Sequence, residues 1–262
     1  MKSRQSNYME GNMTLNMQKR LFDHLAPQAS GVVVADVRIG LGYTAVKLES
    51  GHAGIAWTPK SDSPHCTHFQ EAGTLAGRPA REILAYLADE HSSLGRALGL
   101  ATANALLSAL PHPPVSRDEI ITSLNIASGE RVVMIGYFAP VIAHLKRIGC
   151  RLDIVELKPH AGETITPEEG KKALSECSVA IITGTSLING TCDELLAGLG
   201  RPRAAVLLGP SSPLCTDVFK GTGITHVAGS RVRDVDAVLR IVSEGGGTMI
   251  IKKHVDFETV NV

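Results

Sequence analysis

Three loops in the second half of the chain each follow a short apolar run directly, and the loops as a group are rich in Gly, Ser, Thr and Asn. In a parallel α/β sheet, such loops lie at the carboxyl ends of the strands, where ligands bind. Their backbone groups and hydroxyls can close on a small polar ligand, so the pattern predicts both a fold class and a ligand site. The run-and-loop pairs are 132–136 with 137–140, 180–182 with 183–191, and 204–208 with 209–214.

Length and composition favour a globular protein of two domains. The 262 residues exceed what one ordinary domain needs and are few for three, and 44% of them are hydrophobic, which is ample for a core. Aromatic residues make up only 4%, which argues against a protein that works by stacking on bases. Because 26 Lys and Arg residues balance 26 Asp and Glu residues without a basic run, we expect no nucleic-acid partner.

The distribution of apolar residues and cysteines predicts a cytoplasmic protein without a membrane partner. No apolar stretch approaches the roughly 18 residues needed to span a bilayer, and the polar start lacks the apolar core of a signal peptide. Disulfides are not expected in the cytoplasm. The cysteines are odd in number, widely spaced and free of CxxC pairs, which argues against a zinc ribbon or a thioredoxin-type site; they are Cys66, Cys150, Cys177, Cys192 and Cys215.

The first half of the chain predicts a small α+β domain. A disordered lead-in over 1–13 precedes a helix over 14–26. Tight glycine turns separate short β-branched and alternating segments, which is typical of an antiparallel meander. The three strands of this meander are expected at 32–39, 43–48 and 54–58.

Two helices are expected after the meander. Pro79 fits the first turn of one, and Ser92 or Ser93 can cap a longer helix that runs to about Leu110. The residues of this longer helix are small and apolar almost all round, so it is normally buried between other elements. The alternative is that it forms an oligomer face, in which case the protein is a homo-oligomer or an assembly factor for another protein.

The segment 111–114, Pro-His-Pro-Pro, is the clearest break in the chain, because proline blocks a helix and stiffens a link. It divides a first domain over 14–110 from a second over 118–262, with a linker over 111–117. Alternating strand and helix patterns in the second domain predict a doubly wound, mostly parallel sheet. Its expected strands are 131–136, 151–156, 178–183, 204–209, 224–228 and 247–251, and its expected helices are 138–149, 167–175, 191–199, 213–220 and 233–243.

The first loop of this sheet has no phosphate-binding glycine motif. Gly136, Tyr137 and Phe138 follow the first strand, but the sequence is not GxGxxG. Glu156 lies 20 residues after Gly136, about where a Rossmann fold places the carboxylate that binds ribose hydroxyls. A nucleoside-type ligand is therefore one interpretation; the alternative is that Glu156 pairs with Lys158 or caps a loop.

The second loop gathers short polar side chains beside glycines, which predicts binding of a polar ligand. Thr191, with Glu194 three residues on, also fits a capping box, so helix capping is the alternative. The acidic residues there disfavour a bare phosphate and favour a polar or metal-linked ligand. The candidate binding residues of this loop are Thr183, Gly184, Thr185, Ser186 and Asn189.

The third loop admits two interpretations of equal weight. Ser212 as an N-cap with Pro213 at the first helical position is good capping chemistry. Free backbone N–H groups at the same place could instead hold a carboxylate. The candidate binding residues here are Gly209, Pro210, Ser211 and Ser212.

A possible metal site lies in the first domain, where His65, Cys66 and His68 fall within four residues. Imidazole and thiolate suit zinc, copper, nickel or iron, although a full site needs ligands from elsewhere. Cys192 and Cys215 follow sheet loops and could face the same crevice; the alternative is that they are inert core cysteines. A transition metal or metal chelate is therefore the cofactor that these residues suggest.

Four segments together carry a family resemblance: GERVVMIGYFAP, VELKP, TGTSLINGT and LLGPSSPL. They resemble the prokaryotic family called the putative heavy-metal chelation domain. The resemblance implies a Rossmann-like domain preceded by a domain similar to the enolase N-terminal fold. It also implies a ligand site in the cleft between them, formed by Tyr137, Phe138, Glu156, 183–189 and 209–213, with Cys66 opposite. Enolase chemistry is not implied, because enolase's catalytic barrel has no counterpart here.

The leading hypothesis is a protein that binds a small polar ligand, such as a heavy-metal ion or metal chelate, in the interdomain cleft. The rival hypothesis is a transferase or lyase that uses a nucleoside-type cofactor held by Glu156. No nucleophile elbow, Walker loop or HExxH motif is present to nominate catalytic residues.

Overall fold

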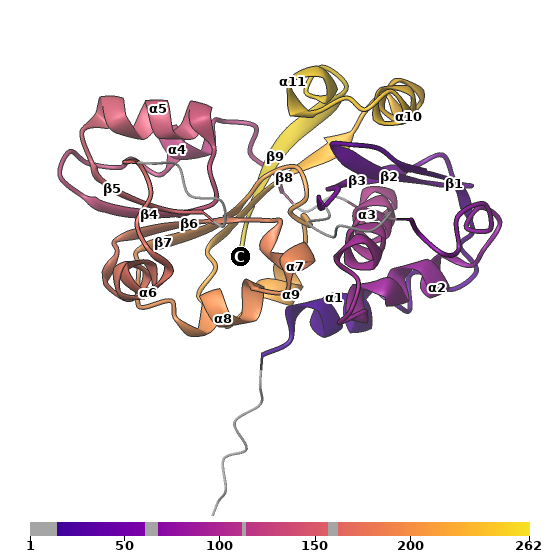
Figure 1. Cartoon of the computed structure of the whole chain (residues 1–262), viewed down its shortest axis with the longest axis horizontal. Helices are drawn as coiled ribbons and strands as arrows, with labels where there is room; N and C mark the ends of the chain where they lie inside the picture. The colour runs from indigo at the N-terminus through magenta and orange to yellow at the C-terminus, as the bar shows by residue number, and fades with distance from the viewer. Residues whose placement is uncertain (1–14, 61–67, 112–113, 157–161) are drawn as a thin grey trace, which may run out of the picture.

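The computed structural model describes residues 15–60, 68–111, 114–156 and 162–262, and contains two sheets (Figure 1). A three-stranded antiparallel sheet lies in the first half of the chain. A six-stranded, mostly parallel sheet lies in the second half. The predicted mixed α/β fold is thereby confirmed.

The small sheet has the order β1-β2-β3, with antiparallel pairing throughout. Two of the helices beside it begin at side-chain caps: Asn16 accepts a hydrogen bond from the Lys19 N–H, and Ser92 accepts one from the Gly95 N–H. Ser92 is therefore the cap that the sequence left open between two serines. The elements are α1 (Met17–Leu25), β1 (Val34–Ile39), β2 (Tyr43–Leu48), β3 (Ala53–Trp57), α2 (Ala80–Leu84), the 3₁₀ helix η1 (Ala85–Ala88) and α3 (Ser93–Ala109).

The small sheet is covered on both faces. Val46 and Ala56 pack on the side of α3, whereas Ala45 and Ile55 pack against α10 (Val235–Ser243), a helix from the second half of the chain. Helix α3 is buried along almost its whole length inside the chain, so the prediction of a buried helix is confirmed and the alternative of an oligomer face is wrong. The oligomeric state itself stays a prediction.

The large sheet has the order β5-β4-β6-β7-β8-β9, and only β9 runs antiparallel to its neighbour. Alternate residues of its strands face two separate cores. Along β6, for example, Ala180 and Ile182 belong to one core, and Val179 and Ile181 belong to the other. The strands are β4 (Arg131–Ile135), β5 (Arg151–Val155), β6 (Val179–Thr183), β7 (Ala204–Leu208), β8 (His226–Val232) and β9 (Val255–Asn261).

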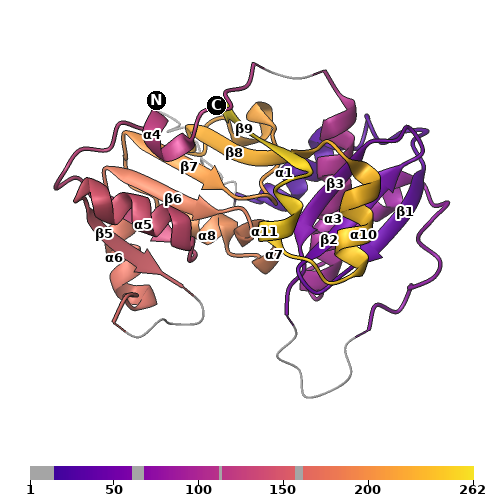
Figure 2. The same ribbon diagram turned by 90° about the horizontal axis from the view of Figure 1, so that it is seen from above.

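Helices cover both faces of this sheet, as a doubly wound fold requires (Figure 2). Helices α4 and α5 lie on one face, and α6 to α9 lie on the other (Figure 1). Within the described ranges, no helix is long and apolar enough to cross a membrane. The bounds are α4 (Ile120–Ser123), α5 (Ala139–Ile148), α6 (Pro167–Glu176), α7 (Ser186–Asn189), α8 (Cys192–Ala197), α9 (Thr216–Phe219) and α11 (Thr248–Ile251).

Two predicted elements were wrong near the end of the chain. The expected strand over 247–251 is helix α11, in which Ile251 is buried while Met249 and Ile250 are exposed. One-sided burial of an apolar run is the pattern of a helix at a surface. The last strand is instead β9. The helix expected over 213–220 shortens to the single turn α9.

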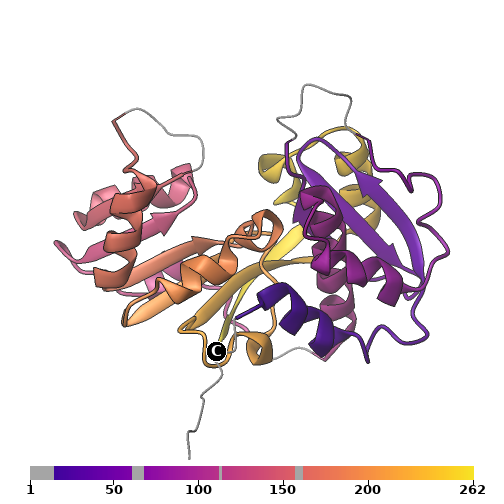
Figure 3. The same cartoon turned by 60° about the horizontal axis from the view of Figure 1, so that its bottom comes forward.

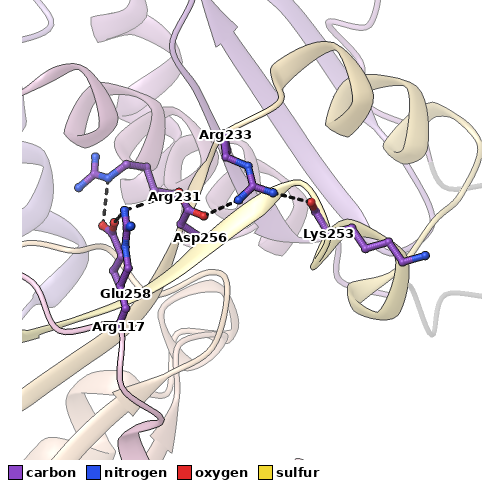
Figure 4. A network of polar contacts seen from close by, with 6 residues as sticks. All are labelled: Arg117, Arg231, Arg233, Lys253, Asp256 and Glu258. Atoms are coloured by element: carbon purple, nitrogen blue, oxygen red, sulfur yellow. Dashed lines mark hydrogen bonds and ion pairs between the residues drawn. The ribbon is translucent and has the colours of Figure 1, made fainter.

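A polar network fastens the segment with Ser116 and Arg117 to the edge of the large sheet (Figure 4). Ser116 exchanges both backbone hydrogen bonds with Thr259 of β9, at 2.9 and 2.8 Å. Beside it, the buried Glu258 carboxylate bonds to Arg231 at 3.1 Å and to the exposed Arg117 at 3.2 Å. A pairing partner for β9 also covers part of a sheet edge that is otherwise open. Arg233 extends the network by bonding to Asp256 and to the Lys253 carbonyl.

The first prediction concerns the closest approach between β3 and α3. A Cβ added at Gly54 would overlap the backbone of Ala101 and Ala105, so neither side can move away cheaply. We expect Gly54→Ala to lower the free energy of unfolding by about 3 kcal/mol, measured by denaturant titration. Gly247→Ala is the matched control, because a Cβ there meets nothing within 4 Å and its φ of −117° suits any residue. Equal denaturant midpoints of unfolding for the two variants would contradict this close packing of β3 on α3.

Candidate functional site

The strand order creates a switch point at the carboxyl end of the large sheet. From β4 the chain moves outward to β5, and it then returns to β6 on the other side of β4. In doubly wound sheets, the crevice at such a reversal is where ligands bind. The three loops singled out in the sequence follow β4, β6 and β7, so all of them open at this end of the sheet.

The first loop contacts both of the others. Gly136 has φ of 101°, which suits glycine, and a Cβ there would lie 3.0 Å from the Thr183 side chain. The Phe138 ring passes between the loops, because a Cβ on Gly209 would lie 3.6 Å from it. The half-buried Phe138 ring therefore forms an apolar wall beside the polar residues of the switch point.

The second and third loops are packed together as well. A Cβ on Gly184 would overlap Ser212, so only glycine fits at this point. The buried Ser211 hydroxyl accepts a hydrogen bond from the Trp57 N–H at 2.8 Å, and its carbonyl accepts one from Asn104 Nδ2 at 3.3 Å. Ser211 thus joins the large sheet to β3 and α3, which belong to the small sheet and its helices, α1 to α3 (the small-sheet unit).

The polar side chains of the second loop differ in their surroundings. Thr183 and Thr185 are half-buried, and their hydroxyls bond to each other at 2.9 Å. Asn189 is also half-buried. The hydroxyls of Ser186 and Ser212 are buried, and neither has a hydrogen-bond partner among the described residues. Buried polar atoms are nearly always paired, so each of these two hydroxyls lacks a partner that a water or a ligand group would have to supply. The Cys192 thiol lies next to the Ser186 hydroxyl, but it is a weak hydrogen-bonding group.

The alternative interpretations based on helix capping fail in both loops. Thr191 makes no side-chain cap bond to α8, and Glu194 pairs with Lys171 at 2.8 Å instead of closing a capping box. Ser212 does not cap a helix, because α9 begins only at Thr216. Helix α8 does begin directly after Thr191, but the backbone of Thr191 is already helical (φ −94°, ψ −6°) and its side chain makes no cap bond. Helix α9 begins later than predicted, because a longer loop precedes it.

Glu156 lies beside the first loop. The Gly136 N–H donates to the Val155 carbonyl at 2.8 Å, which places the half-buried Glu156 at the neighbouring strand end. Tyr137 points to a different group, since its hydroxyl donates to Glu163 at 2.6 Å. This hydrogen bond, together with the charge of Glu163, raises the pKa of Tyr137. The carboxylate position predicted for a ribose-binding residue thus lies next to the switch point.

The structure assembles no metal centre from the part of the chain that it describes: no group there of three or more His, Cys, Asp or Glu residues could hold an ion. His65 and Cys66 lie outside the described residues, and His68 is exposed. Cys192 and Cys215 are buried in the shared core. Burial raises the pKa of Cys215, and it raises the pKa of Cys192 to about 12 against the opposing effect of its neighbour Ser186. Since the thiolate is the metal ligand, these two residues are poor ligands.

Two surface hollows lie away from this end of the sheet. One, of about 400 Å³, is lined by charged residues of β1, β2 and α10. The other, of about 340 Å³, lies between β2 and the end of α3. Neither includes a residue of the three loops.

The fold places this chain among mixed α/β proteins built on a doubly wound sheet. Sequence models of two families, both described as "Putative heavy-metal chelation", match residues 118–261 and 22–107. The first match alone covers more than half of the chain, and the protein therefore belongs to the family that carries this description. The resemblance drawn from its loop motifs is confirmed.

One relative by sequence and two by structure match nearly the whole chain. An uncharacterized protein of Methanocaldococcus jannaschii is 25% identical over 244 residues, which cover 90% of this chain and 93% of that protein. A crystal structure from Pyrococcus horikoshii, of unknown function and from the family matched by 118–261, has a TM-score of 0.81 at 21% identity. It covers 94% of this chain and 100% of that one. A crystal structure from Desulfitobacterium hafniense has a TM-score of 0.75 at 22% identity, and the match covers 93% of this chain and 100% of that one.

The second prediction concerns the buried thiols. At pH 8 the raised pKa of Cys192 makes its thiolate fraction on the order of a thousandfold smaller than that of an ordinary thiol. We expect Cys177, Cys192 and Cys215 to resist iodoacetamide in the folded protein and to react after unfolding, as read by peptide mass mapping. The half-exposed Cys150 is the internal comparison. Rapid labelling of Cys192 under native conditions would show that the site opens.

Proposed function

We propose that this protein binds a small polar ligand, specifically a metal–chelate complex, at the carboxyl end of the large sheet. The observation that supports this proposal is the packing of three polar loops around one switch point. Ser186 and Ser212 bring buried hydroxyls there without partners among the described residues. The family's description as a heavy-metal chelation family agrees with this ligand class.

The donor chemistry of the loops favours a chelate over a bare ion. Heavy metals prefer thiolate and imidazole ligands, whereas the three loops supply hydroxyls and backbone groups. The buried cysteines stay protonated because burial raises their pKa values. In a chelate, the organic molecule already satisfies the metal, and the protein needs only to hydrogen-bond the organic shell.

A direct contact to the metal remains part of the proposal. The segment that carries His65, Cys66 and His68 follows β3, and Trp57 at the end of β3 bonds to Ser211 of the third loop. Imidazole and thiolate from that segment could add one or two ligands to an incoming chelate. This contact stays a prediction.

The third prediction tests the hydroxyls of the second loop. Thr183→Val keeps the shape of the side chain and removes its hydroxyl. We expect it to weaken zinc–citrate binding about fivefold, since one neutral hydrogen bond contributes about 1 kcal/mol. Isothermal titration calorimetry with zinc–citrate and with zinc chloride alone measures the effect. Thr44→Val is the matched control, because Thr44 shares a similar hydroxyl pair with Thr58, at 3.0 Å, in the small sheet.

Two results would count against the proposal. Zinc chloride binding as tightly as zinc–citrate, with Thr183→Val unchanged, would mean that side chains elsewhere hold a bare ion. Equal losses in the Thr183 and Thr44 variants would assign the effect to stability instead of ligand contact.

A second candidate function is an enzyme with a nucleoside-type cofactor, favoured by one observation. The half-buried Glu156 carboxylate lies beside Gly136 at the switch point, as in folds that bind ribose hydroxyls there. The absence of a GxGxxG motif removes the usual pyrophosphate cradle, so a nucleoside without a diphosphate is the better match.

The fourth prediction separates this candidate from the first. If Glu156 binds a ribose, Glu156→Ala should weaken binding of an adenosyl compound by about 1–3 kcal/mol, while Glu90→Ala on the exposed surface should not. Calorimetry with S-adenosylmethionine and adenosine provides the measurement. Failure of the wild type to bind either compound would rule out this candidate and leave the chelate proposal untouched.

A further inference from the structure

Helix α7, which carries polar residues of the second loop, has no hydrogen-bond donors of its own for the carbonyls at its carboxyl end. It is a single turn, Ser186–Asn189, and a helix end leaves its last carbonyls without intrahelical partners. Among the described residues, no backbone N–H reaches the carbonyls of Leu187 and Ile188. Both residues are buried, so water is not a ready substitute donor.

The missing donors come from the small-sheet unit. Gln18 of α1 is buried, and its Nε2 donates to the Leu187 carbonyl at 3.1 Å. Arg96 of α3 donates from Nε to the Ile188 carbonyl at 2.5 Å and from Nη1 to the Asp89 carbonyl at 2.6 Å. Figure 3 shows α1 and α3 lying alongside the α7 and α8 segment.

A third bond holds the far end of the same segment. Asp193, in the first turn of α8, accepts a hydrogen bond from the Met17 N–H at the start of α1, at 2.9 Å. The first turns of α1 therefore contact the second loop at both ends. These turns precede residues 22–107, which the family's sequence model matches, so the family match does not imply this contact.

We propose that Gln18 and Arg96 are positioning residues for the ligand site: they hold α7 in the turn that presents Thr185, Ser186 and Asn189. This inference rests on the proposed function, because it assigns those side chains to the ligand. The site then depends on both halves of the chain. Helix α7 of the second half contacts the ligand, and α1 and α3 of the first half hold α7 in place. Release of α1 lowers ligand affinity without altering any residue that contacts the ligand.

Helix α1 also offers a matched control. Arg20, two residues after Gln18, donates from Nη2 to the Lys220 carbonyl at 3.1 Å, beyond the end of α9 and away from α7. Removing that bond loosens a tie between α1 and the large-sheet unit without unpairing a carbonyl of α7. A general effect of α1 docking would appear in both variants, whereas a positioning effect appears only when Gln18 changes.

The experiment compares Gln18→Met, Arg96→Lys and Arg20→Ala with the wild-type full-length chain. Methionine keeps the length of glutamine and cannot donate, and lysine keeps the charge of Arg96 but loses its two-pronged donation. Hydrogen–deuterium exchange reports the opening of α7 directly. We expect the amides of Leu187 to Thr191 to exchange about tenfold faster in the Gln18 and Arg96 variants, with β4 unchanged. Arg20→Ala should match the wild type.

Zinc–citrate titration completes the test. We expect affinity to fall about tenfold in Gln18→Met and Arg96→Lys and to persist in Arg20→Ala. If the variants fold and the α7 amides exchange at the wild-type rate, Gln18 and Arg96 do not position α7. If these amides exchange faster but zinc–citrate affinity stays at the wild-type value, the position of α7 does not matter for the ligand. If the wild type binds no zinc–citrate, the proposed ligand class fails, and the exchange data still decide whether Gln18 and Arg96 hold α7.

Discussion

The close packing of α3 on β3 is the contact on which the rest of this structure depends. Gly54 lies against the backbone of α3, and the small residues of that helix make this distance attainable. The same helix bonds to two of the loops that follow strands of the large sheet, through Asn104 to Ser211 and through Arg96 to Ile188. A displacement of α3 would therefore move two of the three loops at the switch point together.

Elements with a strong local pattern could be predicted from the sequence. The strand at 43–48 has the predicted bounds, and the small-residue helix starts after a serine cap as expected. Continuous apolar runs in the second half predicted the parallel strands, because a strand covered on both faces needs apolar residues throughout. The convergence of the loops also followed, since all of them end strands of one parallel sheet.

Features that depend on distant partners could not be predicted. Met249 and Ile250 resemble a strand by composition, and only their exposure at the surface reveals the helix. Ser212 has good capping chemistry, but the chain starts its helix later. Ser211 was predicted as a ligand-binding residue, and nothing in the sequence indicated that Trp57 and Asn104, both far away along the chain, donate hydrogen bonds to it. Local patterns therefore indicate which loops lie together better than they indicate the partners of individual atoms.

The distribution of soft and hard donors indicates how metal specificity could arise in such a fold. A site of thiolates selects a metal by affinity, but Cys192 and Cys215 are buried thiols with raised pKa values. Hydroxyls such as those of Thr183 and Thr185 bind most metals weakly and instead distinguish the shape and hydrogen bonding of an organic molecule. Because two sheets hold these hydroxyls in place, selectivity in this protein would reside in the chelator, and the metal would be recognised through the geometry that it imposes on the chelator.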